Sequence, residues 1–284
     1  MRILAIGCFH GRIPTGFKRY VKKNKIDAIF ALGDYPGERM RTLYFKHSGL
    51  AKRDKWGFYD WSPIDKFLGK RRVARMEACD RKDGVRVLQG LNGLGVPVYT
   101  TYGNHDNTEH WPYGEIGYNR RNLLEDVIKP FKNITFLDYD TARLGDYTLA
   151  FSGVKYPNFY KEDTKRVHAK KVDVRAEERS NLLRMIEDPE FTVVVTHAPP
   201  YGTGLDRVND RKKPGYGQHF GDDVLRGVVK RKQPRLVLCA HFHENQGMTR
   251  IGKTQVVCTG YGKKGQAALI ELGKTPKARL VRIR

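Results

Sequence analysis

The sequence predicts an α/β protein built in layers. Short apolar runs of β-prone residues recur along its 284 residues, and bounded runs of this kind are typical of buried strands. Stretches with helical periodicity separate them. Five runs end directly in a cluster of polar residues, at 2–7, 27–32, 96–102, 191–195 and 235–240. Because ligands of open α/β sheets bind at the carboxyl ends of the strands, we expect the five clusters to converge.

Helices and further strands follow in order along the chain. The apolar pattern predicts helices over 85–95, 118–129, 174–187 and 222–232. Additional strands are expected at 134–137, 147–154, 248–257, 267–272 and 279–283, and the tail suggests an antiparallel sheet. The sequence contains no internal repeat and no low-complexity linker. This favours one domain over 1–284 with a basic, aromatic-rich insertion or cap at about 38–95.

The composition argues against a membrane-spanning protein. Hydrophobic residues make up 39% of the chain, and no apolar stretch approaches the roughly 18 residues that cross a bilayer. The residues before the first polar cluster are too few for a signal peptide, so a cytoplasmic location is expected. The cysteines show no paired spacing, which predicts free thiols or metal ligands. Two of the four, Cys239 and Cys258, lie in apolar runs and are expected in the core.

The net charge of +22 indicates a polyanionic partner or substrate. Residues 38–82 contain 13 basic and 6 acidic residues, so this segment alone carries +7. Aromatic residues are interleaved there, at 44–46 and 55–61. A charged groove with stacking faces is how proteins hold single-stranded nucleic acid, and nucleic acid is therefore an expected partner. The alternative is a solvated cap whose aromatic residues form a small local core.

The five polar clusters consist of residue types that bind metal ions. Histidine, carboxylate, amide and thiol groups are all metal ligands. Taken singly, a histidine is most often a core or surface residue, and a Gly-Asp or Gly-Asn pair is a turn signal. Five of the nine histidines nevertheless fall at strand ends, which makes the joint pattern a strong one. The clusters are Cys8-Phe9-His10, Gly33-Asp34, Gly103-Asn104-His105-Asp106, Thr196-His197-Ala198-Pro199 and His241-Phe242-His243.

The order of these clusters resembles the signature of the calcineurin-like metallophosphoesterases, D-x-H, G-D, G-N-H-D/E, a single H and G-H-x-H. The resemblance extends from residue 1 to about 260. The last two motifs are similar to those of small bacterial and archaeal phosphoesterases of the cyclic-nucleotide-phosphodiesterase type. The resemblance implies an α/β (α+β) fold, a four-layer αββα sandwich of two mixed β-sheets flanked by helices. It also implies a centre of two divalent metal ions, with manganese, zinc or iron as candidates.

Carried over residue by residue, the resemblance implies two groups of metal ligands that share Asp34. A shared carboxylate suits ions held roughly 4 Å apart, and such ions lower the pKa of a bound water toward about 7. Metal-bound hydroxide would then attack phosphorus in line with the leaving group. The general acid would be His105, oriented by Asp106. The implied ligands are His10, Asp34 and His243 for one ion and Asn104, His197 and His241 for the other.

The first motif departs from the family because Cys8 replaces the usual aspartate. If Cys8 binds as a thiolate, its ion should be zinc or iron rather than magnesium or manganese. If it does not bind, that ion keeps three protein ligands and is held more weakly. A buried structural cysteine is the third possibility. Two smaller departures are Ala240 in place of a glycine and Gly37 where some relatives carry a second acid, a role open to the adjacent Glu38.

Phosphodiester hydrolysis in a nucleotide or nucleic acid is the expected activity. The alternatives are a phosphomonoesterase or protein phosphatase on the same centre, or a non-catalytic nucleic-acid-binding scaffold on a degenerate phosphoesterase fold. Retention of the general acid His105 argues against a scaffold. Candidates for contacting the substrate are Arg12, Arg39 and His219, although surface exposure is the commoner fate of a single arginine in so basic a chain.

Overall fold

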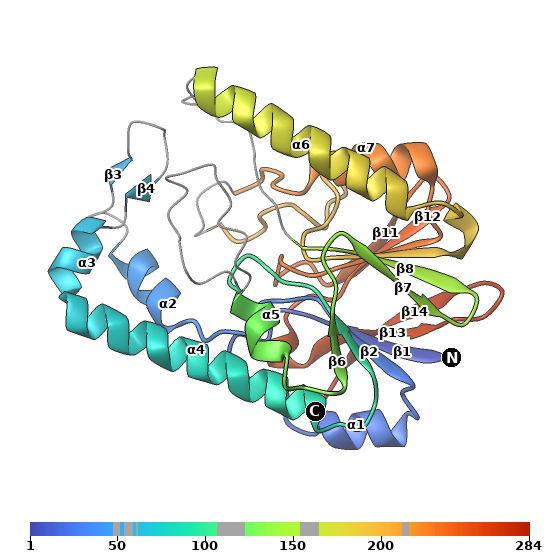
Figure 1. The fold of residues 1–284 in the computed structure, drawn as a ribbon, viewed down its shortest axis with the longest axis horizontal. Coiled ribbons are helices and arrows are strands. Elements are labelled where there is room, and N and C mark those ends of the chain that lie inside the picture. The colour runs from blue at the N-terminus through green and yellow to red at the C-terminus, as the bar shows by residue number, and fades with distance from the viewer. Residues whose placement is uncertain (48–51, 54–58, 61, 107–122, 154–164, 212–215) are drawn as a thin grey trace.

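The computed structural model describes residues 1–47, 52–53, 59–60, 62–106, 123–153, 165–211 and 216–284. Two six-stranded mixed β-sheets pack face to face, and helices cover their outer faces (Figure 1). This is the αββα sandwich that the family resemblance implies, so the predicted fold class is confirmed.

The first sheet contains the three strands that precede the first three polar clusters. Its strand order is β14-β13-β1-β2-β5-β6. The strands β1, β2, β5 and β6 run parallel to one another, whereas β13 pairs antiparallel with both β1 and β14. The bounds are β1 Arg2–Ile6, β2 Ala28–Ala31, β5 Val98–Thr100, β6 Ile134–Phe136, β13 Gln266–Glu271 and β14 Lys277–Arg282.

The second sheet contains the strands that precede the last two clusters. Its strand order is β11-β12-β10-β9-β8-β7, with a parallel centre and one antiparallel strand at each edge. The bounds are β7 Asp140–Leu144, β8 Tyr147–Ser152, β9 Thr192–Thr196, β10 Leu236–Cys239, β11 Gly247–Ile251 and β12 Thr254–Cys258. A separate two-stranded ribbon pairs β3 Lys52–Arg53 with β4 Tyr59–Asp60.

Side-chain alternation along β1 shows how the layers form. Ile3 and Ala5 point into the apolar core between the two sheets. Leu4 and Ile6 point outward, into a second core beneath the helices of the first sheet. Because a strand buried on both faces needs apolar residues at every position, the sequence shows continuous apolar runs rather than apolar-polar alternation. A third core lies between the second sheet and its helices.

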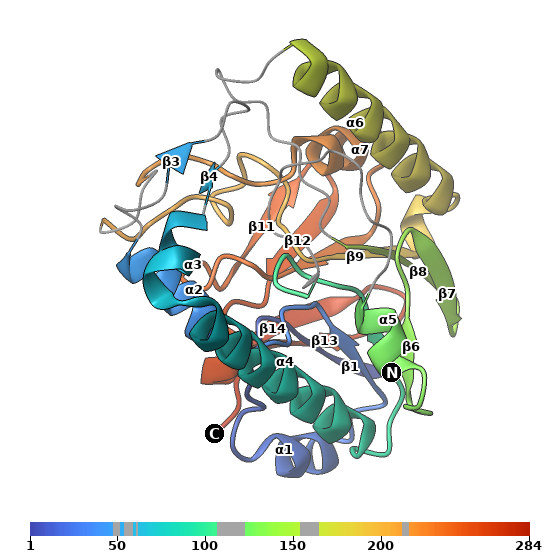
Figure 2. The same ribbon diagram turned by 60° about the vertical axis from the view of Figure 1, so that its left-hand side comes forward.

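Among the described residues, five helices cover the outer faces of the sandwich. Helices α1, α4 and α5 lie outside the first sheet, and α6 and α7 lie outside the second (Figure 2). Two begin earlier than the periodicity predicts, since α4 starts at Lys70 and α6 at Lys165. Asp222 caps α7 by accepting a 2.8 Å hydrogen bond from the Leu225 amide. The bounds are α1 Phe17–Lys23, α4 Lys70–Asn92, α5 Leu123–Ile128, α6 Lys165–Met185 and α7 Asp223–Lys232.

The basic insertion forms a small lobe with its own apolar cluster. Helices α2 Arg39–Lys46 and α3 Ser62–Leu68 pack with the N-terminal half of α4; we call this the α2–α4 lobe. Its centre is built from buried apolar side chains, which explains why α4 extends beyond the sheet and begins before its periodic segment. Tyr44 packs against this centre. The aromatic residues at 55–58 and 61 lie outside the described residues. The central residues are Met40, Ile64, Leu68 and Val73.

The predicted antiparallel pairing of the tail is confirmed within each hairpin, but the prediction of one tail sheet is wrong. Residues 248–257 form two strands, β11 and β12, separated by a turn at Gly252. The hairpin β11–β12 belongs to the second sheet and the hairpin β13–β14 to the first. Both hairpins are antiparallel. They belong to different sheets because β12 pairs with β10 and β13 pairs with β1. Strand β7 was not predicted. The described helices include none long and apolar enough to cross a membrane.

Candidate metal centre

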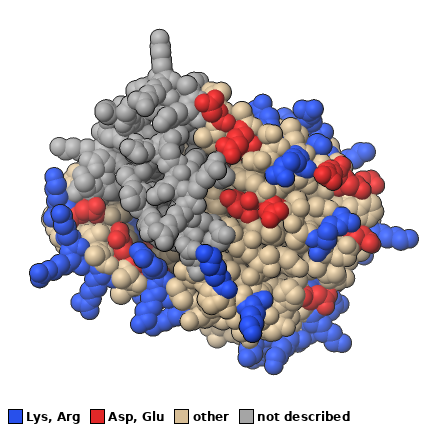
Figure 3. Space-filling view, viewed as in Figure 1, with Lys and Arg blue, Asp and Glu red and all other residues tan. Residues whose placement is uncertain are grey.

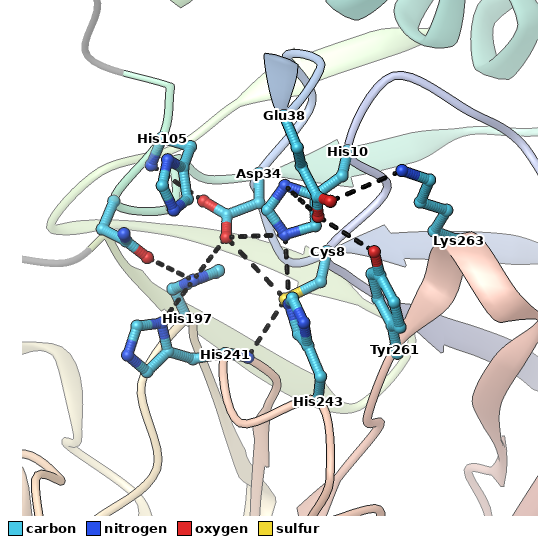
Figure 4. Close-up of polar contacts among 12 residues, drawn as sticks. Cys8, His10, Asp34, Glu38, His105, His197, His241, His243, Tyr261 and Lys263 are labelled. Atoms are coloured by element: carbon cyan, nitrogen blue, oxygen red, sulfur yellow. Dashed lines mark hydrogen bonds and ion pairs between the residues drawn. The ribbon is translucent and has the colours of Figure 1, made fainter. Parts of the chain in front are cut away.

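The five polar clusters converge, as the strand-end rule predicts. Strands β1, β2 and β5 of the first sheet and β9 and β10 of the second lead into loops whose side chains face one another (Figure 4). Two groups of potential ligands result, and within each group the ligand atoms lie within 4.8 Å of one another. The groups are Cys8, His10, Asp34 and His243, and Asp34, His197 and His241.

The loops are held in backbone conformations that few residues adopt. Cys8, His10, Asp34 and His241 all have positive φ, between 43° and 68°. Outside glycine, this left-handed region costs free energy, and such residues cluster at functional sites. Gly33 also has positive φ, and a Cβ there would collide with the backbone of Gly103. The loops after β2 and β5 can therefore approach closely enough for their ligands to meet.

One ligand group surrounds His197. The Nδ1 of His197 lies 2.5 Å from the Leu32 carbonyl oxygen and donates to it, which leaves Nε2 facing the site. That Nε2 atom is 3.3 Å from Asp34 Oδ2 and 3.2 Å from both Asn104 Oδ1 and His241 Nδ1. Asn104 thus joins the group. Two oxygen acceptors and an imidazole nitrogen aimed at one point fit a bound cation.

The other group surrounds His10. Its Nε2 lies 3.0 Å from His243 Nε2 and 3.5 Å from Asp34 Oδ2. Cys8 Sγ is 3.8 Å from the same carboxylate oxygen and accepts a 3.2 Å hydrogen bond from the His241 amide. Oδ2 of Asp34 therefore faces both groups, which is the position of a carboxylate shared by two ions.

The electrostatics of the site also fit bound cations. Burial lowers the pKa of His10 to about 2 and lowers that of His241 well below its usual value, so both imidazoles are neutral. Burial opposes ionisation of Asp34, but His197 and His105 hold its pKa well below the usual range. Burial and the Asp34 carboxylate raise the pKa of the Cys8 thiol, so thiolate formation there requires a positive charge nearby.

Asp106 fastens the loops together. Its Oδ2 accepts hydrogen bonds of 2.6 Å from the Asp34 and Gly103 amides, and its Oδ1 accepts one of 2.7 Å from the Tyr35 amide. Both carboxylate oxygens are thus engaged with backbone N–H groups, whereas the sequence suggested that Asp106 orients the His105 ring. Asp106 is a positioning residue for the Asp34 and Gly103 backbones.

His105 lies beside the ligand groups. Its amide donates a 2.9 Å hydrogen bond to Asp34 Oδ1, and its ring meets the His10 ring edge-on at a centroid distance of 5.3 Å. Burial lowers the pKa of His105, so its imidazole is neutral at pH 7 and offers one N–H and one lone pair. Its role as general acid stays a prediction.

The three substrate-contact candidates have different surroundings. Arg39 forms ion pairs with Asp80 and Asp83 on α4, so its guanidinium fastens α2 to α4. His219 Nδ1 lies 2.8 Å from Oδ1 of the buried Asp206, which holds the loop before α7. Arg12 is exposed in the loop after β1. None of the three contacts a predicted metal ligand among the interactions of the described residues.

Sequence reasoning missed Tyr261 and Lys263 beside His10 and His243, and it considered Glu38 only as a substitute for a second acid after Asp34. The ring of Tyr261 stacks on the ring of His243, and its hydroxyl donates a 2.9 Å hydrogen bond to Glu38 Oε1. Lys263 Nζ lies 3.5 Å from Glu38 Oε2. The position of residues 259–264 could have indicated that they border the site, because they follow the carboxyl end of β12. The predicted strand 248–257 concealed it, since its parallel pairing with β10 was not recognised.

Comparison with known proteins agrees with this geometry. A family model for calcineurin-like phosphoesterases matches residues 1–245. The uncharacterized protein MJ1162 of Methanocaldococcus jannaschii is 25% identical over 178 residues, which cover 61% of this chain and 69% of that protein.

Solved structures match the fold along the whole chain. TT1561 of Thermus thermophilus has a TM-score of 0.52 at 14% identity, covering 100% of this chain and 99% of that one. GAP50, described as the anchor in the inner membrane complex of Plasmodium, has a TM-score of 0.52 at 15% identity, with coverage of 100% and 85%. With the family match over residues 1–245, the converging strand-end ligands place this chain in the calcineurin-like phosphoesterase family.

Proposed function

We propose that this protein is a metal-dependent phosphodiesterase acting on a nucleotide or nucleic acid. Family membership implies the coarser activity, a metal-dependent phosphoric ester hydrolase. The observation that carries the proposal is the Asp34 carboxylate, whose Oδ2 faces both ligand groups. A carboxylate in this position suits a pair of divalent ions, which is the arrangement found in two-metal hydrolytic sites.

The residues of the site have separable tasks in this proposal. Divalent ions, when bound, supply a low-pKa water and neutralise phosphate charge. Asp34, Asn104, His197 and His241 would hold one ion, and Asp34, Cys8, His10 and His243 the other. His105, fixed through its amide to Asp34 Oδ1, would offer its imidazole N–H to the leaving oxygen.

Surface charge supports a polyanionic substrate. The loop that carries Asp34 continues directly into α2, so the α2–α4 lobe borders the metal centre. Figure 3 shows Lys and Arg side chains along the left and lower edges, the side on which α3 and α4 lie in Figure 1, and also along the right side of the molecule. A basic surface beside the site would attract the phosphates of a nucleic acid.

The proposal is tested with paired chromogenic esters. We expect the wild type to bind two divalent ions and to hydrolyse bis-p-nitrophenyl phosphate faster than p-nitrophenyl phosphate. Asp34→Asn should lose both ions and both activities, because it removes the charge that the two groups share. Metal analysis and initial rates with manganese, zinc and iron measure this.

Each other outcome has a definite meaning. Faster hydrolysis of the monoester, with no cleavage of oligonucleotides or cyclic nucleotides, would show that the protein is a phosphomonoesterase rather than a phosphodiesterase. A wild type that binds no metal and hydrolyses neither ester would overturn the enzyme and leave a nucleic-acid-binding scaffold. Asp140→Asn, at an exposed position of β7, is the matched control and should leave metal content and both rates unchanged.

A further inference from the structure

We infer that Glu38, Tyr261 and Lys263 form an outer layer that orients both histidines of the Cys8, His10 and His243 ligand group (Figure 4). Glu38 comes from the loop before α2, which follows the Gly33-Asp34 motif, whereas Tyr261 and Lys263 come from the turn after β12, outside the family motifs of the sequence. The inference rests on the proposed metal centre and concerns how this chain holds one of its two ions.

Glu38 determines which nitrogen of His10 faces the metal. His10 Nδ1 is deeply buried and has no hydrogen-bond partner among the described residues, and the carboxylate oxygen Oε1 of Glu38 lies 3.3 Å away. The carboxylate favours the proton on Nδ1, because a positive partial charge there faces a negative group. Nε2 then presents its lone pair to the site, which is the orientation that a metal ligand needs.

Tyr261 connects Glu38 to the second histidine. Its ring lies parallel to the ring of His243, with a centroid distance of 4.0 Å and an interplanar angle of 4°. Its hydroxyl donates to the same Glu38 Oε1 atom that faces His10. One tyrosine therefore fixes the plane of His243 and the position of the Glu38 carboxylate together.

Backbone contacts make this layer rigid. The Gly262 amide donates a 2.9 Å hydrogen bond to the Gly7 carbonyl, and the Lys263 amide donates one of 3.1 Å to the Cys8 carbonyl. The turn that bears Tyr261 and Lys263 is thereby tied to the loop that bears Cys8. The ammonium group of Lys263 lies 3.5 Å from Glu38 Oε2 and forms an ion pair with this carboxylate.

A histidine of the second ligand group is held by a different kind of partner, so the inference applies to one ion only. His197 is held by the backbone carbonyl of Leu32 rather than by a side chain. Loss of Glu38 should therefore lower the affinity for the ion of the Cys8, His10 and His243 group and leave the affinity for the other ion unchanged. Partners of this outer kind typically change metal affinity by about 10- to 100-fold.

The test is titration of the metal-free protein with Mn²⁺, followed by calorimetry and metal analysis. We expect two ions in the wild type and, in Glu38→Gln, one ion of unchanged affinity and one bound about 10- to 100-fold more weakly. Tyr261→Phe keeps the stacked ring and removes the hydroxyl, so it should show a smaller loss than Tyr261→Leu. Glu77→Gln, at an exposed position of α4, is the matched control, and thermal unfolding of the metal-free variants verifies folding.

Double variants assign the weakened ion to its group. In a His241→Ala background, Glu38→Gln should weaken the remaining ion, whereas in a His243→Ala background it should change little, because that group is already disabled. Two ions bound by Glu38→Gln as tightly as by the wild type would overturn the inference and leave the metal centre standing. A wild type without metal would overturn the metal centre itself.

Discussion

At the scale of single residues, Asp34 lies close to histidines of both ligand groups. Its Oδ2 lies 3.3 Å from His197 Nε2 and 3.5 Å from His10 Nε2. Its Oδ1 accepts from the His105 amide, and its own amide donates to Asp106. One side chain thus contributes to both ligand groups and to the loop that carries the proposed acid. This explains why the Asp34 variant is the decisive one for the proposed function.

We predict that the sulfur of Cys8 sets which metal ion its ligand group prefers. A thiolate favours zinc or iron, whereas a carboxylate favours manganese or magnesium. Cys8→Asp should therefore raise the manganese content relative to zinc when both ions compete for the metal-free protein, as measured by metal analysis. Cys79→Ser, an exposed cysteine on α4, should leave the ratio unchanged. An unchanged ratio in Cys8→Asp would show that the sulfur is not a ligand.

At the scale of secondary structure elements, α4 has a buried apolar face and an exposed basic face. Its buried face packs on the first sheet and on the lobe. Its other face is exposed and basic, and four of its cations recur at spacings of four and seven residues, which places them on one side of the helix. These residues are Arg71, Arg75, Lys82 and Arg86.

Neutralising this basic face should weaken nucleic-acid binding. We expect replacement of the four residues by glutamine to lower the affinity for a single-stranded oligonucleotide. The slope of log K against log salt should fall by about 0.7 for each phosphate that the variant no longer neutralises. Binding measured at several salt concentrations gives both values. An equal change on α1, which lies away from the lobe (Figures 1 and 2), should have less effect; the residues are Lys18, Arg19, Lys22 and Lys23. Equal effects of the two sets would show non-specific attraction only.

The buried contact between α6 and α7 predicts that the free energy of unfolding depends on pH. Glu178 of α6 is buried against Asp222, with Tyr139, Arg175 and Asp223 as the other titratable neighbours. Burial first, and then the Asp222 carboxylate, raise the pKa of Glu178 well above its usual value. A carboxyl whose pKa is raised by folding contributes stability at low pH, and this contribution is lost as pH rises through the folded-state pKa.

The free energy of unfolding should therefore fall from pH 5 toward pH 8 more steeply in the wild type than in Glu178→Gln. One group contributes at most about 1.4 kcal/mol per pH unit. Urea denaturation across this pH range measures the slopes. The exposed Glu187→Gln is the control and should retain the wild-type slope. Equal slopes in wild type and Glu178→Gln would contradict the prediction.

At the scale of the whole molecule, the metal centre joins the two sheets. Cys8, Asp34 and Asn104 follow strands of the first sheet, whereas His197 and His241 follow strands of the second. Bound ions would therefore connect the halves of the sandwich, and the unfolded chain, which separates these ligands, would bind them poorly.

Removal of metal should lower the thermal stability of the protein. An ion present at 100 times its Kd stabilises the folded state by about 2.7 kcal/mol. We expect chelation to lower the Tm of the wild type and to leave that of Asp34→Asn unchanged, as measured by calorimetry together with metal analysis. A wild type that loses its ions without a change in Tm would show that the two sheets do not depend on them.

The strands that precede the proposed ligands could be predicted from the sequence. The continuous apolar runs before Cys8, Asp34 and Asn104 indicate strands buried on both faces, and the observed β1, β2 and β5 lie within those runs. Parallel strands bring their carboxyl ends to one edge of a sheet, so local pattern could predict the convergence of the clusters within each sheet, whereas the face-to-face packing of the two sheets was implied by the family resemblance. The same holds for Cys239 and Cys258, whose predicted burial is confirmed.

The surroundings of the site needed the tertiary structure. The start of α4 lacks an apolar stripe of its own and is helical because Val73 packs with Met40 and Ile64 in the lobe. Likewise, nothing in the local sequence connects Glu38 with Tyr261, which lie 223 positions apart.

Local sequence was enough to predict strands buried on both faces, the order of the family motifs and the types of ligand residue, because these are properties of short segments. Three features could be read from the folded chain alone: the sheet to which each C-terminal hairpin belongs, the hydrogen bonds from backbone amides to Asp106, and the stacking of Tyr261 on His243. These features depend on contacts between segments far apart in the chain, where pairing and packing across the sandwich, rather than local pattern, set the geometry.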